Sequence, residues 1–80
     1  MSDSLGEIEV FVAAADSGRL AHAASALGIS PAAVSASLKR LEASLGVKLM
    51  LRTTRSLRLT QEGERYLAFA RDALESLRQG

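Results

Sequence analysis

The chain has 80 residues, no cysteine and a single histidine. This length suffices for one small domain, and the lack of cysteine excludes disulfides and thiolate metal sites. Hydrophobic residues make up 48% of the chain, but fourteen of them are alanine and three are aromatic. That composition favours close-packed helices over a sheet sandwich or an aromatic-lined pocket. We therefore expect a mainly α-helical domain that holds no cofactor and no metal ion.

The net charge of +1 conceals an uneven distribution. Residues 1–30 carry four acidic side chains and one basic side chain, Arg19, whereas residues 31–60 carry six basic side chains and one acidic side chain, Glu42. Such a concentration of positive charge is typical of a solvated surface or of a nucleic-acid-binding face. Its position among the predicted elements favours the second interpretation.

Several other classes of protein are not expected. No apolar run reaches the roughly eighteen residues of a transmembrane helix, and residues 1–6 lack the basic and apolar regions of a signal peptide, so we expect a cytoplasmic protein. No catalytic triad, carboxylate pair or phosphate-binding loop appears, so we do not expect an enzyme. His22 lies opposite the apolar face of its predicted helix, and we interpret it as an exposed side chain.

The first half of the chain predicts three helices. The first covers about residues 4–16 and carries apolar residues at helical spacing: Leu5, Ile8, Phe11, Val12 and Ala15. The second covers about residues 20–27, and Gly28 suits the left-handed position after it. Ser30-Pro31 starts the third, over about residues 31–45, because serine caps a helix and proline suits its first position. One face of this third helix is apolar and the other is formed mostly by small residues: Val34, Leu38, Leu41 and Leu45 against Ala32, Ala36, Lys39 and Ala43.

The second half predicts a hairpin and a long helix. Four leucines alternate with polar residues on either side of a basic tip at residues 52–56, which indicates two short strands: Leu49, Leu51, Leu57 and Leu59. Helical spacing returns after Thr60, which suits an N-cap, and continues to the C-terminus. The predicted fold is a winged helix-turn-helix over residues 1–59 with a three-helix core and a short β-hairpin wing. A linker helix that serves for dimerisation follows over residues 60–80.

A helix-turn-helix inserts its second helix into the DNA major groove, and a basic hairpin directly after it would be a wing. Small residues on the exposed helix face allow close approach to base edges, while flanking arginines can neutralise phosphates. The order and charge of the predicted elements therefore indicate a DNA-binding domain.

This order of elements, together with a set of local motifs, resembles the N-terminal domain of LysR-type transcriptional regulators. The matching motifs are Phe11-Val12-Ala13, Ala23-Ala24, Leu27-Gly28-Ile29-Ser30, Ala33-Val34-Ser35, Leu41-Glu42, Leu45-Gly46-Val47 with Leu49, Arg52-Thr53-Thr54-Arg55, and Leu59-Thr60 with Gly63. The resemblance implies that Ser30, Ser35 and the start of the third helix face the major groove. It also implies that residues 52–55 reach the DNA backbone or minor groove of an interrupted inverted-repeat promoter site.

The sequence departs from the family pattern where bases are usually read. Pro31-Ala32 replaces the common Gln-Pro, Ala36-Ser37 replaces the common Arg-Gln, and Arg19 replaces a capping Ser or Asn, which forgoes about 1 kcal/mol. We therefore expect phosphate contacts to supply most of the affinity and small residues to make limited base contacts. The candidate DNA-binding residues are Arg19, Ser30, Pro31, Ala32, Ser35, Ala36, Lys39, Arg52, Thr53, Thr54 and Arg55.

The last helix carries an apolar stripe formed by Tyr66, Leu67, Ala70, Leu74 and Leu77. Antiparallel packing of two such helices would form a homodimer and place two recognition helices on one face of the DNA. Alternatively, the stripe folds back on the second face of the first helix, at Val10 and Ala14, and both arrangements can coexist.

The resemblance further implies an effector-binding domain after the linker helix, with a small-molecule effector and a tetrameric full-length protein. This domain has no counterpart in the 80 residues. A different class of function is a winged-helix module that binds proteins or dimerises without binding DNA. The alanines at positions 32, 36 and 43 would give such a module an apolar contact patch on the third helix.

Overall fold

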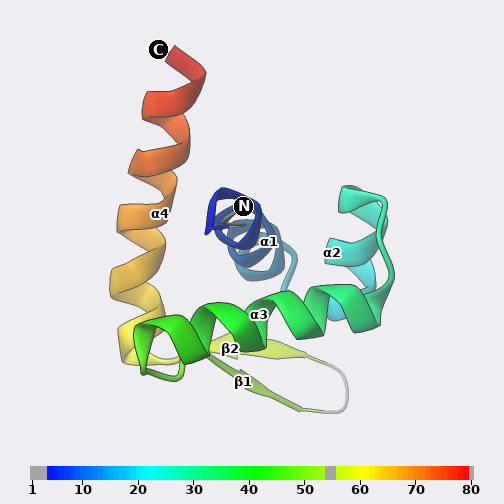
Figure 1. The fold of residues 1–80 in the computed structure, drawn as a ribbon. Coiled ribbons are helices and arrows are strands. Elements are labelled where there is room, and N and C mark those ends of the chain that lie inside the picture. Colours follow the sequence, from blue (N-terminus) through cyan, green and yellow to red (C-terminus); the bar gives the residue numbers. More distant parts are fainter. Residues whose placement is uncertain (1–3, 54–55, 80) are drawn as a thin grey trace.

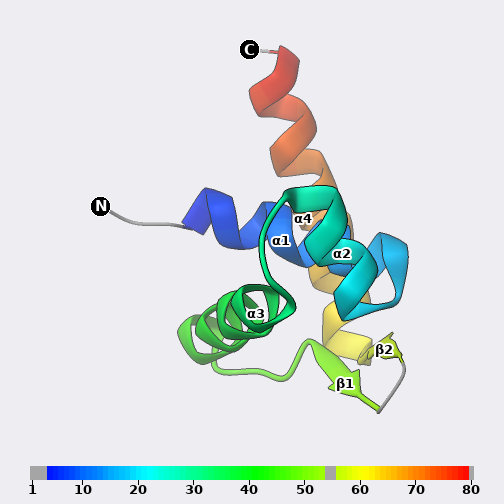
Figure 2. The same cartoon turned by 90° about the vertical axis from the view of Figure 1, so that its right-hand side faces the viewer.

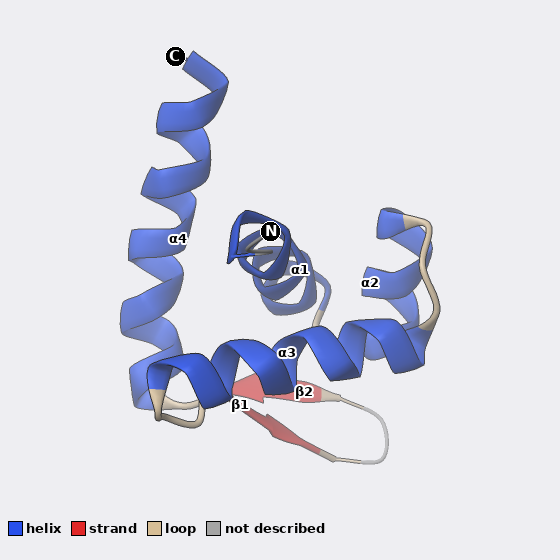
Figure 3. Cartoon of the chain, in the orientation of Figure 1, coloured by secondary structure: helices blue, strands red, loops and turns tan. Residues whose placement is uncertain are grey.

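A computed structural model describes residues 4–53 and 56–79 of the chain. In chain order the elements are α1 (Ser4–Ser17), α2 (Leu20–Leu27), α3 (Pro31–Leu45), β1 (Met50–Arg52), β2 (Leu57–Leu59) and α4 (Gln61–Gln79) (Figure 1). Helices account for most of the described residues, and the strands form one short antiparallel hairpin (Figure 3). The predicted mainly α-helical winged helix-turn-helix is confirmed, with helix boundaries within one residue of those expected.

Helix α1 lies at the centre of the molecule and packs against α2, α3 and α4 (Figure 1). Phe11 and Ala14 of α1 are completely buried, and Val34 of α3 closes the core beneath them. Alanines occupy several of the remaining core positions, at Ala23, Ala24 and Ala70. Because alanine has a small side chain, neighbouring helices approach closely, as the alanine-rich composition suggested.

The ends of the helices follow the predicted capping signals. The Ser30 hydroxyl accepts a hydrogen bond from the Ala33 N–H (3.1 Å), and Pro31 occupies the first turn of α3. Gly28 and Gly46 end α2 and α3 with φ of 72° and 73°, a conformation in which a side chain would be strained. Arg19 occupies the N-cap position of α2 without a side-chain hydrogen bond to the helix, as expected.

The two short strands expected around the basic tip are present, and their register shows which side chains share a face. Met50 pairs with Leu59, Leu51 with Arg58, and Arg52 with Leu57. Met50 and Leu57 are buried, so the face they share points inward, and Leu51 on the other face is 53% exposed. Leu49 is buried before β1 begins, so the spacing of the leucines along the chain does not by itself give the face on which Leu51 lies.

The start of β1 is joined to α3 and α4 at a site that we call the α3–α4 junction, formed by Glu42, Leu49, Met50, Thr60 and Gly63. One Glu42 carboxylate oxygen accepts hydrogen bonds from the Leu49 and Met50 N–H groups (2.8 and 3.1 Å). The Thr60 hydroxyl caps α4 by accepting from the Gly63 N–H (2.9 Å), and it donates to the Lys48 carbonyl (2.6 Å). A Cβ at Gly63 would lie 2.0 Å from the Leu49 carbonyl oxygen, so only glycine fits there.

Helix α4 begins on the core and ends beyond it. Tyr66 packs edge-on against Phe11 with ring centroids 5.5 Å apart, and Ala70 and Leu74 are buried against the rest of the chain. The C-terminal half of α4 extends away from the other elements (Figures 1 and 2), and Leu77 is 60% exposed. Of the two arrangements expected for the apolar stripe, the structure shows the packing of α4 against α1, which covers much of the stripe.

Within residues 4–53 and 56–79, no helix is both long and apolar enough to cross a lipid bilayer. The same residues contain no group of three or more His, Asp or Glu side chains arranged to hold a metal ion.

Candidate nucleic-acid interface

The N-terminal half of α3 presents small side chains to solvent. Val34, Leu38 and Leu41 are buried on one side of the helix, and this burial fixes its orientation. The opposite side is exposed and carries Pro31, Ala32, Ala36 and Lys39. Since no bulky side chain stands on this side before Lys39, another molecule can approach the helix backbone closely.

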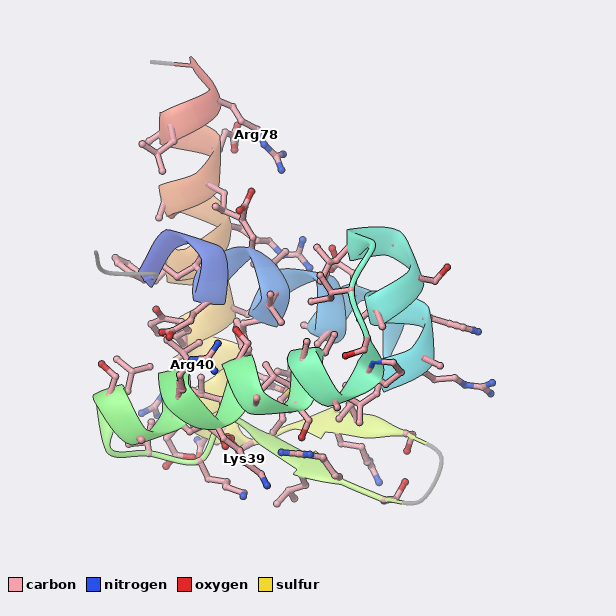
Figure 4. The ribbon with its side chains drawn as sticks, turned by 45° about the vertical axis from the view of Figure 1, so that its right-hand side comes forward. Lys39, Arg40 and Arg78 are labelled. Atoms are coloured by element: carbon pink, nitrogen blue, oxygen red, sulfur yellow. The ribbon has the colours of Figure 1, made fainter. Side chains whose placement is uncertain are left out.

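Lys39 and Arg40 are adjacent in sequence but point to opposite sides of α3. Lys39 is exposed on the side of the hairpin, whereas Arg40 points toward α1 (Figure 4). The Arg40 Nε lies 3.4 Å from a Glu7 carboxylate oxygen, and this ion pair joins α3 to α1. Of the two adjacent cations, Lys39 therefore contributes its charge to the exposed side of α3.

The start of α2, the start of α3 and the hairpin enclose a hollow of about 260 Å³. The Leu57 N–H donates to the Gly18 carbonyl (2.9 Å), which fixes the hairpin beside the turn before α2. Arg19, Pro31 and Thr53 line the hollow together. Three candidate residues from distant parts of the sequence thus meet at one place on the surface.

A side-chain hydrogen bond links the hairpin to the edge of the exposed side of α3. Arg52 ends β1, and its Nη1 donates to the hydroxyl of Ser35, which is half-buried. Arg52 itself remains exposed. We call the combined area the α3–hairpin surface and define it by Arg19, Pro31, Ala32, Ser35, Ala36, Lys39 and Arg52.

The remaining candidate residues lie around the hairpin turn and the α3 cap. The Thr53 hydroxyl accepts a hydrogen bond from the Ser56 N–H (2.9 Å), and the Thr53 N–H donates to the Ser56 carbonyl (2.9 Å), so Thr53 closes the turn. Ser30 is exposed at the edge of the surface, where its hydroxyl caps α3. Thr54 and Arg55 lie outside the described residues.

Not every basic residue of the central segment joins this surface. Arg58 pairs with Leu51 on the opposite face of the hairpin from Arg52, and both are exposed there. The alternation of a strand places neighbouring side chains on opposite faces, but the correct phase depended on the position of Met50 rather than Leu49. Arg58, which was not among the candidate DNA-binding residues, therefore adds no charge to the α3–hairpin surface.

A second hollow lies on the other side of the molecule, between the end of α3 and the first half of α4. It measures about 370 Å³ and is lined by Leu45, Val47, Tyr66 and Phe69, among others. Phe69 is 59% exposed, and its ring centroid lies 5.6 Å from that of Tyr66. Phe69 is absent from the predicted apolar stripe, although its spacing of three residues from Tyr66 was a usable signal.

The surroundings of Tyr66, near the start of α4, perturb its ionisation. Burial raises the pKa of its phenol above the ordinary 10.0, and the nearby Glu7 carboxylate raises it further. The phenol lies beside the core rather than on the α3–hairpin surface. Its perturbed pKa therefore reports on the packing of α4 against α1.

Comparison with known proteins adds independent information about this fold. Residues 5–64 match the family described as "Bacterial regulatory helix-turn-helix protein, lysR family". The chain is 48% identical over 77 residues to "Uncharacterized HTH-type transcriptional regulator y4mQ" of Sinorhizobium fredii. The matched region covers 96% of this chain and 26% of that protein. The chain spans about a quarter of the length of the curated relatives that it matches.

Solved structures show the same architecture. The structure titled "Crystal structure of CbnR_DBD-DNA complex" superposes with a TM-score of 0.92 at 34% sequence identity, over 95% of this chain and 87% of that one. The structure titled "Crystal Structure of BenM_DBD/benA site 1 DNA Complex" gives a TM-score of 0.90 at 29% identity, over 95% and 85% of the two chains. The motif match, the sequence identity and the superposed fold agree, and the chain belongs to the LysR family of bacterial regulatory helix-turn-helix proteins.

Proposed function

We propose that this chain binds double-stranded promoter DNA and thereby regulates transcription. The observation that carries the proposal is the α3–hairpin surface, on which a helix face of small residues is flanked by Arg19, Lys39 and Arg52. Two similar structures, those of CbnR_DBD and BenM_DBD, bear titles that describe complexes with DNA. The family match supports the same function.

In the proposed complex, the N-terminal half of α3 enters the major groove, which is wide enough for one helix. Alanine methyl groups can touch thymine methyl groups but cannot read guanine or adenine edges, so base contacts by α3 itself are limited. Arg19 and Lys39 contact phosphates on either side of the groove. Arg55, with Thr54, continues these contacts from the wing tip to the backbone or minor groove.

We further propose that two copies bind an interrupted inverted repeat through dimerisation of α4. Ala70 and Leu74 are already buried within one chain, so a partner would contact the stripe beyond them, at Leu77, and the neighbouring Phe69. A Leu77→Glu substitution should convert the dimer into a monomer in sedimentation experiments and weaken DNA binding. A dimer that persists in Leu77→Glu would contradict this role for the end of α4.

The test of DNA binding is a titration of the chain into a labelled duplex from the promoter region upstream of its own gene, with a scrambled duplex as control. Fluorescence anisotropy is followed between about 50 and 200 mM salt. We expect tighter binding to the promoter duplex and an affinity that falls steeply with salt. Equal, weak binding to both duplexes would contradict sequence-specific recognition by this domain.

Lys39 and Arg40 provide a matched pair for locating the interface. Lys39→Ala should reduce the slope of log affinity against log salt by about 0.9, the value for one lost phosphate contact. Arg40→Ala removes the same charge from the α1 side of the helix and should leave the slope unchanged. Equal effects of the two substitutions would place the DNA elsewhere. Absence of binding at low salt would favour the protein-interaction module instead.

A further inference from the structure

The exposed half of α3 lacks the side chains that usually read bases in the major groove. Pro31, Ala32, Ala33 and Ala36 carry no side-chain hydrogen-bond donor or acceptor. Lys39 follows two turns after the N-terminus of α3. A surface of this kind needs a donor from another element if it is to recognise guanine.

Arg52 is the side chain that reaches this part of α3. The strand register places it on the same face as Met50 and Leu57, which are buried toward the helices, and not on the outer face with Leu51 and Arg58. Its Nη1 donates to the Ser35 hydroxyl. Ser35, which is half-buried, lies one residue before Ala36 and one helical turn before Lys39, at the edge of the exposed side.

The contact leaves the guanidinium equipped to bind a second partner. Arginine carries five N–H donors, and the bond to Ser35 uses one of them. The Nε and Nη2 edge retains two parallel donors, the arrangement that matches the O6 and N7 acceptors of guanine. Because the bond to Ser35 orients the side chain before DNA binds, less rotamer entropy is lost on binding.

We propose that Arg52 determines specificity by reading a guanine in the major groove, and that Ser35 is its positioning residue. The inference rests on the proposed DNA-binding function. It assigns to the hairpin a role that α3 cannot perform with its own side chains. Arg52 was expected to contact phosphates, and its contact with Ser35 argues for a place over α3 instead.

The experiment begins with a duplex selected by the 80-residue chain from a random pool. Each guanine of the selected site is then replaced in turn by 7-deazaguanine, which removes the N7 acceptor and leaves base pairing intact. For the unmodified protein we expect one guanine at which this replacement weakens binding by about 10-fold, the effect of a lost hydrogen bond to a charged donor. Binding of Arg52→Ala and Arg52→Met should be insensitive to the replacement at that guanine.

The other variants separate the proposed roles. Ser35→Ala keeps Arg52 but frees its side chain, so the sensitivity at that guanine should fall to about 3-fold while the salt slope stays unchanged. Arg58→Ala removes a cation from the opposite face of the hairpin and should leave the sensitivity at its full value. Far-UV circular dichroism is used to check that each variant is folded. If Arg52→Ala does not fold, Arg52→Met replaces it, because methionine retains the aliphatic stem of the side chain.

The outcomes distinguish this inference from the proposed function. If Arg52→Met weakens binding equally for the native and the modified duplexes, Arg52 contacts phosphate and the inference is overturned, while DNA binding stands. If no guanine responds to the replacement, the inference is likewise overturned. If the unmodified chain selects no duplex, the proposed function fails and the inference fails with it.

Discussion

The α3–α4 junction and the α3–hairpin surface, on the two sides of α3, differ in how their backbone groups are hydrogen-bonded and in which side chains they expose. At the α3–α4 junction, a carboxylate pairs with two backbone N–H groups, a threonine caps the next helix, and a glycine allows close backbone contact. On the α3–hairpin surface, alanines are exposed and Arg19 leaves the start of α2 without a side-chain cap. Stabilising contacts are therefore concentrated on one side of α3, and the other side keeps residues suited to binding.

The largest expected effect is at Gly63. Gly63→Ala would force a Cβ to within 2.0 Å of the Leu49 carbonyl oxygen, and the backbone must move to relieve the contact. We expect the free energy of unfolding to fall by about 3 kcal/mol, measured by urea denaturation. Gly6 is the matched control, because it lies in α1 with open space around it, and Gly6→Ala should stabilise the chain by about 0.5 to 1 kcal/mol. Similar effects of the two substitutions would contradict the close packing at the junction.

Glu42 comes next, since its carboxylate accepts from two backbone N–H groups at the start of β1. Glu42→Ala leaves both donors without this partner and should lower the free energy of unfolding by about 2 kcal/mol, whereas Glu42→Gln keeps an acceptor and should cost about half as much. Glu62→Ala, at an exposed position in the first turn of α4, should cost at most about 1 kcal/mol. DNA binding of the folded variants should be unchanged. If the affinity of Glu42→Gln for DNA no longer depended on salt, the α3–α4 junction and the α3–hairpin surface would not be independent.

Substitutions of Arg19 test the α3–hairpin surface. Arg19→Ser supplies the missing N-cap and should raise the free energy of unfolding by about 1 kcal/mol, while the salt slope of DNA binding falls by about 0.9. Arg19→Ala removes the same charge without supplying a cap, so it should reproduce the loss of slope without the gain in stability. A serine variant that binds DNA with an unchanged salt slope would remove Arg19 from the interface.

The smallest expected effect concerns pH and Tyr66, beside the core. Its phenol is held neutral in the folded chain by burial and by Glu7, which raise its pKa above 10.0, the ordinary value. The unfolded chain therefore releases this proton at lower pH than the folded chain. The contribution to stability is complete below pH 10 and is lost as the pH rises through the folded pKa. Unfolding measured between about pH 8 and 11 should show a decline above pH 10 that is reduced in Tyr66→Phe.

Local sequence determined the helices and their ends. Ser30-Pro31, Gly28, Gly46 and Thr60 act on backbone groups within a few residues, so their effects could be read directly from the order of amino acids. The family motifs and the position of the basic segment were legible for the same reason. The winged helix-turn-helix was therefore predictable without coordinates.

Tertiary structure decided which face each side chain occupies. Burial of Met50 fixed the phase of β1, which exposed Leu51 and directed Arg52 toward Ser35. The packing of α4 on α1 buried Ala70 and Leu74, while Phe69 and Leu77 stayed exposed. The pairing of Arg40 with Glu7 spans 33 residues. Local periodicity cannot specify such contacts, because they depend on how elements distant in sequence are packed together.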